Sequence, residues 1–173
     1  MGLASDLSYE FPRANWFQRA VKAFAGTPPG AWLFSKVLRY LDDLVQKLTR
    51  GRTSAPEVLA GLPVLDVTTT GRKSGQPRTS HLISIPIGDT LALLGTNFGQ
   101  PATPAWALNL EANPNATVRY RDRSATVIAR PATETEFAQV LASSRPIYPG
   151  YRKYQQRIGE SRRLRIFVLE PAG

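Results

Sequence analysis

The spacing of apolar residues changes near residue 63, and this change constrains the fold more than any other feature of the chain. Upstream of it, apolar side chains recur at helical spacing in two stripes. The first contains Trp16, Phe17, Ala20, Val21 and Phe24, and the second contains Leu33, Val37, Tyr40, Leu41, Leu44 and Leu48. The sequence Thr-Pro-Pro-Gly at residues 27–30 interrupts the helical pattern between them. We therefore predict an N-terminal helical extension over residues 1–60.

Strand-like segments follow residue 63. Their apolar patterns predict strands over residues 64–70, 81–87, 90–96, 116–120, 125–129 and 164–169. A short helix is expected over residues 104–111, and Thr133 with Glu136 forms a capping box for a second helix over residues 134–144. Antiparallel strands with interspersed helices are typical of a small α+β barrel with helices packed outside it. We predict one such domain over residues 61–173.

A basic turn directly follows the first predicted strand. Residues 68–78 read Thr-Thr-Thr-Gly-Arg-Lys-Ser-Gly-Gln-Pro-Arg. Arg72, Lys73 and Arg78 can make charge-assisted hydrogen bonds, and Gly71 and Gly75 allow backbone conformations in which peptide N–H groups converge on an anion. Neither the glycine spacing of a P-loop nor Gly-x-Gly-x-x-Gly occurs in the chain. The turn predicts a phosphate or carboxylate site of another architecture, and the alternative is an ordinary solvated hairpin turn.

Composition narrows the chemistry further. The net charge of +9 suits a polyanionic ligand, a nucleic acid or an anionic membrane. The absence of cysteine excludes a disulfide framework, a thiol nucleophile and a thiolate metal site, and the single histidine, His81, leaves little for zinc or a Ser-His-Asp triad. We therefore predict no metal. His81 itself is more often a strand residue than a catalyst, although an imidazole near a cofactor can relay protons.

The location of the protein is also constrained. No apolar run approaches the roughly 18 residues of a membrane span, and no signal peptide is recognisable, so a cytoplasmic protein is expected. Apolar stripes such as these two face the protein core more often than they face a membrane. The first stripe nevertheless lies beside Arg13, Arg19 and Lys22, and this mixture of aromatics and cations suits a helix on the inner face of the cell membrane.

Three further clusters accompany the basic turn. They are Gly-Thr-Asn-Phe-Gly at residues 95–99, Pro-Ala-Trp-Ala-Leu-Asn-Leu at residues 104–110 and Tyr-Pro-Gly-Tyr-Arg-Lys-Tyr at residues 148–154. In this order and spacing, the four segments resemble the deazaflavin-dependent nitroreductase family, the coenzyme F420-dependent split-barrel enzymes of actinobacteria. The resemblance covers about residues 62–171. It implies an α+β fold with an antiparallel split β-barrel of the FMN-binding type, flanked by helices.

The resemblance also implies an activity and a cofactor site. The expected enzyme transfers hydride from reduced F420 (F420H2) to a quinone, a nitroaromatic or another electron-poor conjugated substrate. The phosphate and oligoglutamate tail of F420 would lie against the basic turn, and other contacts would line the cofactor or frame its ring. The implied cofactor contacts are Arg72, Lys73, Ser74, Gly75, Arg78, Thr96, Asn97, Gly99, Pro104, Ala105, Trp106 and Asn109. An aromatic at the start of a helix, such as Trp106, is usually a core residue.

The family pattern places the substrate beside three tyrosines. Tyr148, Tyr151 and Tyr154 would form the substrate-facing wall, with Tyr154 as the hydrogen-bond donor to the oxygen that gains charge, and Thr96 is grouped with them as catalytic. The alternative is a tyrosine-rich loop packed on the barrel. Hydride chemistry belongs to the cofactor, so the protein needs neither a nucleophile nor a metal.

The chain departs from the family pattern, and other functions stay open. Many relatives carry Lys-Gly where this chain has Asn97 and Phe98, and they also differ at Ser80 and His81. These differences bear on substrate identity more than on the cofactor. A second hypothesis keeps the barrel but assigns it FMN or haem. A third is a non-catalytic nucleic-acid-binding domain, which the dispersed basic residues and the lack of a standard motif disfavour. We expect a small-molecule substrate and no nucleic acid.

Overall fold

The computed structural model describes residues 2–10, 20, 21, 23, 24, 27–30, 32, 33, 36, 62–147, 156 and 163–172. Its helices are α1 (Leu3–Asp6), the 3₁₀ helix η1 (Asn97–Gly99), α5 (Ala105–Ala112) and α6 (Glu134–Ile147). Its strands are β1 (Leu65–Thr70), β2 (Pro77–Leu82), β3 (Ser84–Ile87), β4 (Thr90–Leu94), β5 (Asn115–Tyr120), β6 (Arg123–Pro131) and β7 (Ile166–Pro171).

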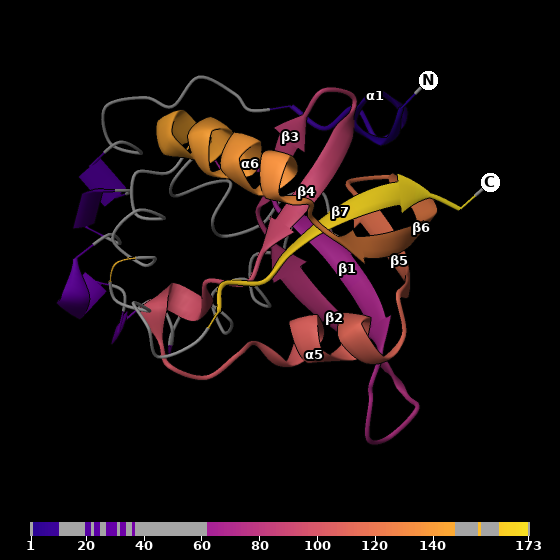
Figure 1. The fold of residues 1–173 in the computed structure, drawn as a ribbon, viewed down its shortest axis with the longest axis horizontal. Coiled ribbons are helices and arrows are strands. Elements are labelled where there is room, and N and C mark those ends of the chain that lie inside the picture. Colours follow the sequence, from indigo (N-terminus) through magenta and orange to yellow (C-terminus); the bar gives the residue numbers. More distant parts are fainter. Residues whose placement is uncertain are drawn as a thin grey trace.

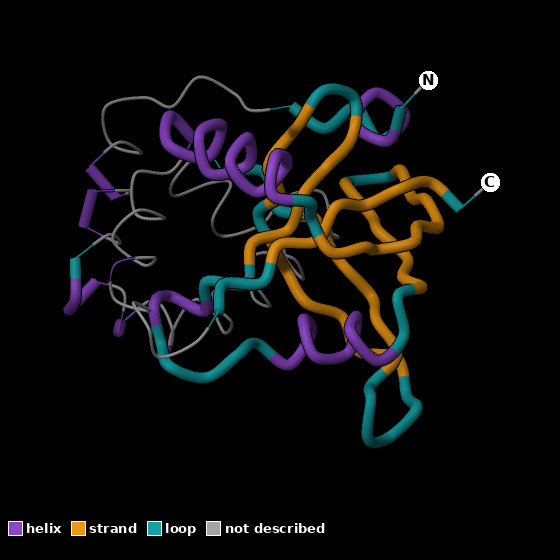
Figure 2. Tube along the Cα trace, viewed as in Figure 1, coloured by secondary structure: helices purple, strands orange, loops and turns teal. Residues whose placement is uncertain are grey.

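The strands form one seven-stranded antiparallel sheet in the order β2-β1-β5-β6-β7-β4-β3. The edge strands β2 and β3 are consecutive in the chain, and only Ile83 separates them. Because a single residue connects the two edges, the sheet has to curl until they approach each other. Figures 1 and 2 show the resulting open barrel. The predicted antiparallel barrel is confirmed.

The strand that the sequence did not predict is β2. The predicted strand over residues 64–70 is confirmed as β1, but Pro77 and Arg78, which were expected in the basic turn, begin β2, so the turn covers only residues 71–76. The strand expected over residues 81–87 is interrupted at Ile83. β2 lies at an edge with its first half exposed, so it lacks the alternation of apolar residues by which strands are recognised.

The inside of the barrel holds the main core. Alternate residues of each strand point inward, as the alternating burial of β5 shows. The inner cluster includes Leu65, Val67, Leu91, Leu93, Val118, Val127, Phe167 and Leu169. A second cluster, with Ile85, Ala92, Leu94, Val140, Leu164 and Ile166, lies under α6 on the outside of the sheet. Figure 1 shows α6 along this side and α5 across the lower end of the barrel.

The N-terminal residues belong to the inner core. Leu3, Leu7 and Tyr9 are 1%, 2% and 5% exposed, and the ring of Tyr9 packs 4.9 Å from that of Tyr120. The carboxylate of Asp89, in the turn between β3 and β4, accepts hydrogen bonds from the N–H of Gly2 and the hydroxyl of Ser5. Residues 2–9 therefore pack against the barrel. The predicted division at residue 60 stays a prediction.

The described part of the N-terminal region is helical on both sides of residue 27. Residues 20, 21, 23 and 24 are in helical conformation, and residues 28–30 begin another helical stretch. The N–H of Gly30 donates to Thr27 Oγ1 at 3.2 Å, which makes Thr27 the cap of this stretch. The helix break was predicted here. The remaining residues of both apolar stripes, apart from Leu33, lie outside the described residues, and no described helix is long and apolar enough to cross a bilayer.

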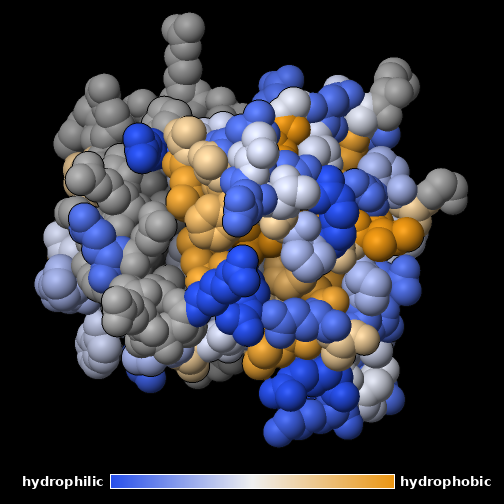
Figure 3. Space-filling view, in the orientation of Figure 1, coloured by the Kyte–Doolittle hydropathy of each residue, from blue (hydrophilic) through white to orange (hydrophobic). Residues whose placement is uncertain are grey.

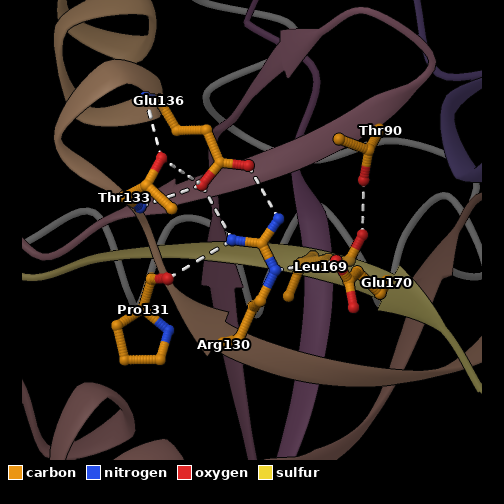
Figure 4. Close-up of polar contacts among 7 residues, drawn as sticks. All are labelled: Thr90, Arg130, Pro131, Thr133, Glu136, Leu169 and Glu170. Atoms are coloured by element: carbon orange, nitrogen blue, oxygen red, sulfur yellow. Dashed lines mark hydrogen bonds and ion pairs between the residues drawn. The ribbon is translucent and has the colours of Figure 1, made fainter.

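The predicted capping box of α6 is present. Thr133 Oγ1 accepts from the N–H of Glu136 at 3.3 Å, and the Glu136 carboxylate accepts from the N–H of Thr133 at 2.9 Å. The same carboxylate accepts from both terminal nitrogens of Arg130, whose Nε donates to Glu170 (Figure 4). Arg130 thereby joins β6, β7 and the first turn of α6.

Candidate functional site

The basic turn forms the tip of the hairpin between β1 and β2. This hairpin projects beyond the sheet next to α5 (Figure 1), and the corresponding tip of the molecule is strongly hydrophilic (Figure 3). Arg72, Lys73 and Arg78 are all exposed. Arg78 is paired with Thr69 in the ladder, so both side chains lie on the face of the hairpin that α5 covers. The β1–β2 ladder therefore fixes the backbone from which these exposed cations extend.

The backbone of this turn is closed by its own hydrogen bonds. The N–H of Gly71 donates to Gln76 O at 2.8 Å, and the N–H groups of Ser74 and Gly75 donate to Gly71 O. The N–H of Gln76 donates to Ser74 Oγ at 3.3 Å. These four N–H groups are occupied inside the turn, and their expected convergence on an anion stays a prediction.

Two glycines make the turn sterically possible. A Cβ atom at Gly71 would lie 2.7 Å from Ser74 Oγ and 3.1 Å from Gln76 O, which is too close. Gly75 has a φ of +67°, in the left-handed region that glycine adopts readily, and a Cβ atom there would meet nothing within 4 Å. The space beside the Gly75 backbone is therefore open to a ligand.

Asn109 connects α5 to the hairpin. Its side chain is buried, with 6% of the residue exposed. Asn109 Oδ1 accepts from the N–H of Arg72 at 3.1 Å, and Nδ2 donates to Thr69 Oγ1 at 3.0 Å. Thr69 Oγ1 in turn donates to Arg78 O at 3.3 Å. Asn109 was predicted as a direct polar contact to a ligand, and in this structure both ends of its amide are bonded to the hairpin.

The segment that leaves β4 approaches the start of α5. Thr96 is 7% exposed, Asn97 has a left-handed φ of +46°, and Asn97 Nδ2 donates to Ala102 O at 2.9 Å. Gly95 is packed against the backbone of Arg165, to whose carbonyl oxygen it donates at 2.8 Å. These contacts fix residues 95–102 between β4 and α5.

The predicted site residues at the start of α5 differ in how far they are exposed. Pro104 stands at the N-cap position and Ala105 is exposed, whereas Trp106 is 8% exposed and belongs to the inner core. The indole of Trp106 packs edge-on against Phe167, with ring centroids 6.0 Å apart. Trp106 is a core residue, as aromatics at helix starts usually are, and its predicted ligand contact stays a prediction.

A groove opens between α6, β7 and the C-terminal end of α5. Its volume is about 450 Å³, and its lining includes Glu111, Phe137, Arg163, Leu164, Arg165 and Ile166. Arg165 Nε donates to Glu111 at 2.8 Å, which ties α5 to the start of β7. Figure 3 shows hydrophobic side chains gathered over the middle of the face that is turned to the viewer in Figure 1. Since Arg165 O bonds Gly95, the groove borders the segment that carries Thr96.

His81 lies in a polar cluster on the outer side of the sheet. His81 Nδ1 is 2.7 Å from Asp66 Oδ1, and Arg119 donates to Asp66 Oδ2 at 2.7 Å. Burial raises the pKa of Asp66, but the hydrogen bonds and charges of His81 and Arg119 outweigh it and hold this pKa below its usual value. The ionised carboxylate can only accept, so His81 Nδ1 carries a proton. This cluster joins β2, β1 and β5, which supports the interpretation of His81 as a strand residue.

Sequence reasoning missed two residues of the hairpin and could not test three others. Thr69 and Asp66 were interpreted only as strand residues, because the burial of the Thr69 hydroxyl and the partial burial of the Asp66 carboxylate become visible only in the fold. Tyr148, Tyr151 and Tyr154 lie outside the described residues. In the described part of the chain, no group of three or more histidine or acidic side chains could hold a metal ion.

Comparison with known proteins decides the family. A family model described as F420H(2)-dependent quinone reductase matches residues 39–171. The chain belongs to this family. The F420H(2)-dependent quinone reductase of Mycobacterium tuberculosis is 33% identical over 91 residues, which are 53% of this chain and 60% of that protein. A relative from Mycobacterium bovis matches to the same extent. The chain thus spans 60% of the length of the curated quinone reductases it matches.

Two solved structures share the fold. An F420-H2 dependent reductase, FDR-A, has a TM-score of 0.57 and 29% identity, over 62% of this chain and 94% of its own. A structure described as a domain-swapped dimer has a TM-score of 0.59 and 25% identity, over 76% of this chain and 98% of its own. The predicted family resemblance and the predicted split-barrel fold are confirmed.

Proposed function

We propose that this quinone reductase family member transfers hydride from reduced F420 to a quinone, and that nitroaromatics and other electron-poor conjugated compounds are accepted in the same way. The observation that carries the proposal is the hairpin tip. Arg72, Lys73 and Arg78 are exposed there, and a hydrogen bond from Arg72 to Asn109 holds the turn to α5. The names of the relatives agree with it.

The side chains of the hairpin fit the anionic part of F420. Among the described residues, the ion pairs of the structure do not involve Arg72, Lys73 or Arg78, so these cations are available to a phosphate and a glutamate tail. Charge-assisted hydrogen bonds from such groups are among the strongest polar contacts in proteins. Ser74 can add a hydroxyl, and the open space at Gly75 lets a ligand approach the backbone.

The remaining predicted contacts would surround the ring. We propose that Thr96, Asn97 and Gly99 line the deazaflavin, and that Pro104, Ala105 and the wall formed by Trp106 frame it. Thr96 and Pro104 lie at the junction of β4 and α5, where the chain is held by the Gly95 and Asn97 hydrogen bonds. Asn109 would act on the hairpin rather than on the ring.

The division of labour follows from hydride chemistry. Bound reduced F420 supplies the hydride. The chain has to orient the substrate, exclude water and stabilise the oxygen that gains charge. We assign this stabilisation to the phenol of Tyr154, with Tyr148 and Tyr151 beside it and Thr96 nearby. The groove next to Arg165, whose lining includes Phe137 and Ile166, is large enough for a flat ring.

We also propose a cytoplasmic location with contact to the anionic inner face of the cell membrane. Phe24, Trp32 and Leu33 support it, because they are 47%, 64% and 42% exposed, which is unusual for side chains of this size.

The proposed function is tested with the full chain. Fluorescence titration should show F420 binding, and reduced F420 should be oxidised when menadione is added. The ultraviolet and visible spectrum of the purified protein should lack bound FMN and haem. Tight binding of FMN or haem without binding of F420 would overturn the proposal, and so would F420 binding without turnover of any quinone or nitroaromatic.

A further inference from the structure

We propose that Asn109 is a positioning residue, which sets the affinity for the cofactor tail by holding the basic hairpin. The inference rests on the proposed function, because it concerns the same site. Its basis is the chain of three hydrogen bonds that joins Asn109 to Arg72, Thr69 and Arg78.

The chemistry of the partners fixes the direction of every bond in this chain. A peptide N–H can only donate, so the N–H of Arg72 requires the Oδ1 atom of Asn109, which leaves Nδ2 facing Thr69. Thr69 Oγ1 accepts a hydrogen bond from Nδ2, so its own O–H group donates a hydrogen bond to Arg78 O. One lone pair of Oδ1 and one N–H of Nδ2 are used in this way, and reversal of the amide would place two donors against each other.

The three anchor points lie on both arms of the hairpin. Thr69 belongs to β1, Arg78 belongs to β2, and Arg72 is the first cation of the turn. Asn109 is 6% exposed and Thr69 is 2% exposed, so water cannot easily replace the lost partners when one is removed. A single buried amide thereby links α5 to the backbone of two of the three cations.

The consequence concerns binding geometry. The N–H groups of Gly71, Ser74, Gly75 and Gln76 are occupied within the turn, and that of Arg72 is occupied by Asn109. With these five N–H groups occupied, an anion is held chiefly by the long side chains, whose effective reach depends on where their backbone is fixed. Loss of the Asn109 contacts should therefore weaken the tail contacts selectively.

The chain offers a matched pair of variants for the test. Thr69→Val and Thr68→Val each remove one hydroxyl from neighbouring positions of β1. Thr68 Oγ1 bonds Thr79 Oγ1 at 2.8 Å on the opposite face and has no link to α5. Asn109→Leu removes both hydrogen bonds of the side-chain amide and replaces it with a side chain of similar volume. Binding of F420 and of a tail-free deazaflavin analogue is measured for each full-length variant, together with amide hydrogen exchange at Arg72.

Asn109→Leu and Thr69→Val should each weaken F420 binding about tenfold while changing the affinity for the tail-free analogue less than twofold. Exchange at the Arg72 amide should accelerate in Asn109→Leu, and Thr68→Val should behave as wild type. If Asn109→Leu does not fold, Thr69→Val against Thr68→Val gives the same comparison.

The outcomes separate this inference from the proposed function. If the wild-type protein binds F420 and both Asn109→Leu and Thr69→Val bind it with the same affinity, the positioning role alone is overturned. Equal losses for F420 and the tail-free analogue would also overturn it, because they would indicate a direct ring contact or a general structural defect. If wild type does not bind F420, the proposed function is wrong and the positioning role with it.

Discussion

The carboxylate of Glu136 accepts two hydrogen bonds of 2.7 Å from the guanidinium of Arg130 and so fastens the first turn of α6 to β6. The hydrogen bond from Arg130, followed by that from the backbone of Thr133, lowers the pKa of Glu136 to about 2. Arg130 also reaches Glu170 on β7. One carboxylate therefore caps a helix and anchors it to the barrel.

This relationship predicts an acid-sensitive stability. A carboxyl group whose pKa is lower in the folded state stabilises the protein above its unfolded pKa of about 4.5, and this contribution is lost as the pH falls toward 2. Glu136→Gln should lower the free energy of unfolding at pH 7 by about 1 kcal/mol and make the stability less dependent on pH below 5. Urea unfolding at several pH values measures this, and identical pH profiles for both proteins would contradict it.

The basic hairpin gives a second prediction. Lys73→Ala and Arg78→Ala should each weaken F420 binding about tenfold or more, since each removes a charge-assisted hydrogen bond. The loss should be greater for cofactor with a long glutamate tail than for a tail-free analogue. Arg145→Ala is a suitable control, because it removes the same charge from the exposed last turn of α6. Unchanged affinity in both hairpin variants, with the fold intact, would remove this site.

The tyrosine wall gives a third prediction. Tyr154→Phe should keep the affinity for F420 but lower turnover by about 10- to 100-fold, because it removes a donor to the oxygen that gains charge. Tyr148→Ala and Tyr151→Ala should instead raise the Michaelis constant for the acceptor. Single-turnover oxidation of reduced F420 by menadione separates these effects. A wild-type rate in Tyr154→Phe would exclude the donor role, and weaker cofactor binding in all three variants would place the tyrosines in the cofactor site or the core.

The N-terminal segment gives a prediction about stability. Leu3 is 1% exposed in the inner core, and Leu3→Ala should lower the free energy of unfolding by about 2–5 kcal/mol. Ser5→Ala, which removes one exposed hydrogen bond to Asp89, should have a smaller effect. Thermal unfolding compares the two variants. Equal melting temperatures for Leu3→Ala and wild type would show that residues 2–9 do not close the barrel in solution.

The membrane proposal requires a test that leaves residues 2–9 in place, because truncation of the N-terminal region would also remove their core contacts. Replacement of Arg13, Arg19 and Lys22 by glutamine should reduce co-sedimentation with anionic vesicles, since each basic residue near the surface contributes about 1 kcal/mol. Co-sedimentation that is equal for this variant and wild type would count against contact through the first apolar stripe.

Local sequence patterns determined much of the barrel. The alternating residues of β5 and the capping box of Thr133 and Glu136 each specify one element through contacts within a few residues, and these predictions were confirmed. The order of the basic turn, the 95–99 segment and the α5 sequence identified the family. The glycines at 71 and 75 also predicted a tight turn. Such features can be read directly because their physical causes lie close together in the chain.

Only the tertiary structure decided what the polar residues do. β2 became a strand because β1 offered it a ladder, although its own residues lack strand-like alternation. The four-residue helix α1 became part of the core because Asp89, more than 80 positions away, holds it. Asn109 was read as a ligand contact, and its amide instead meets Thr69 and Arg72, 40 and 37 positions earlier. A hydrogen bond depends on the partner that folding brings within reach, and no local pattern contains that information.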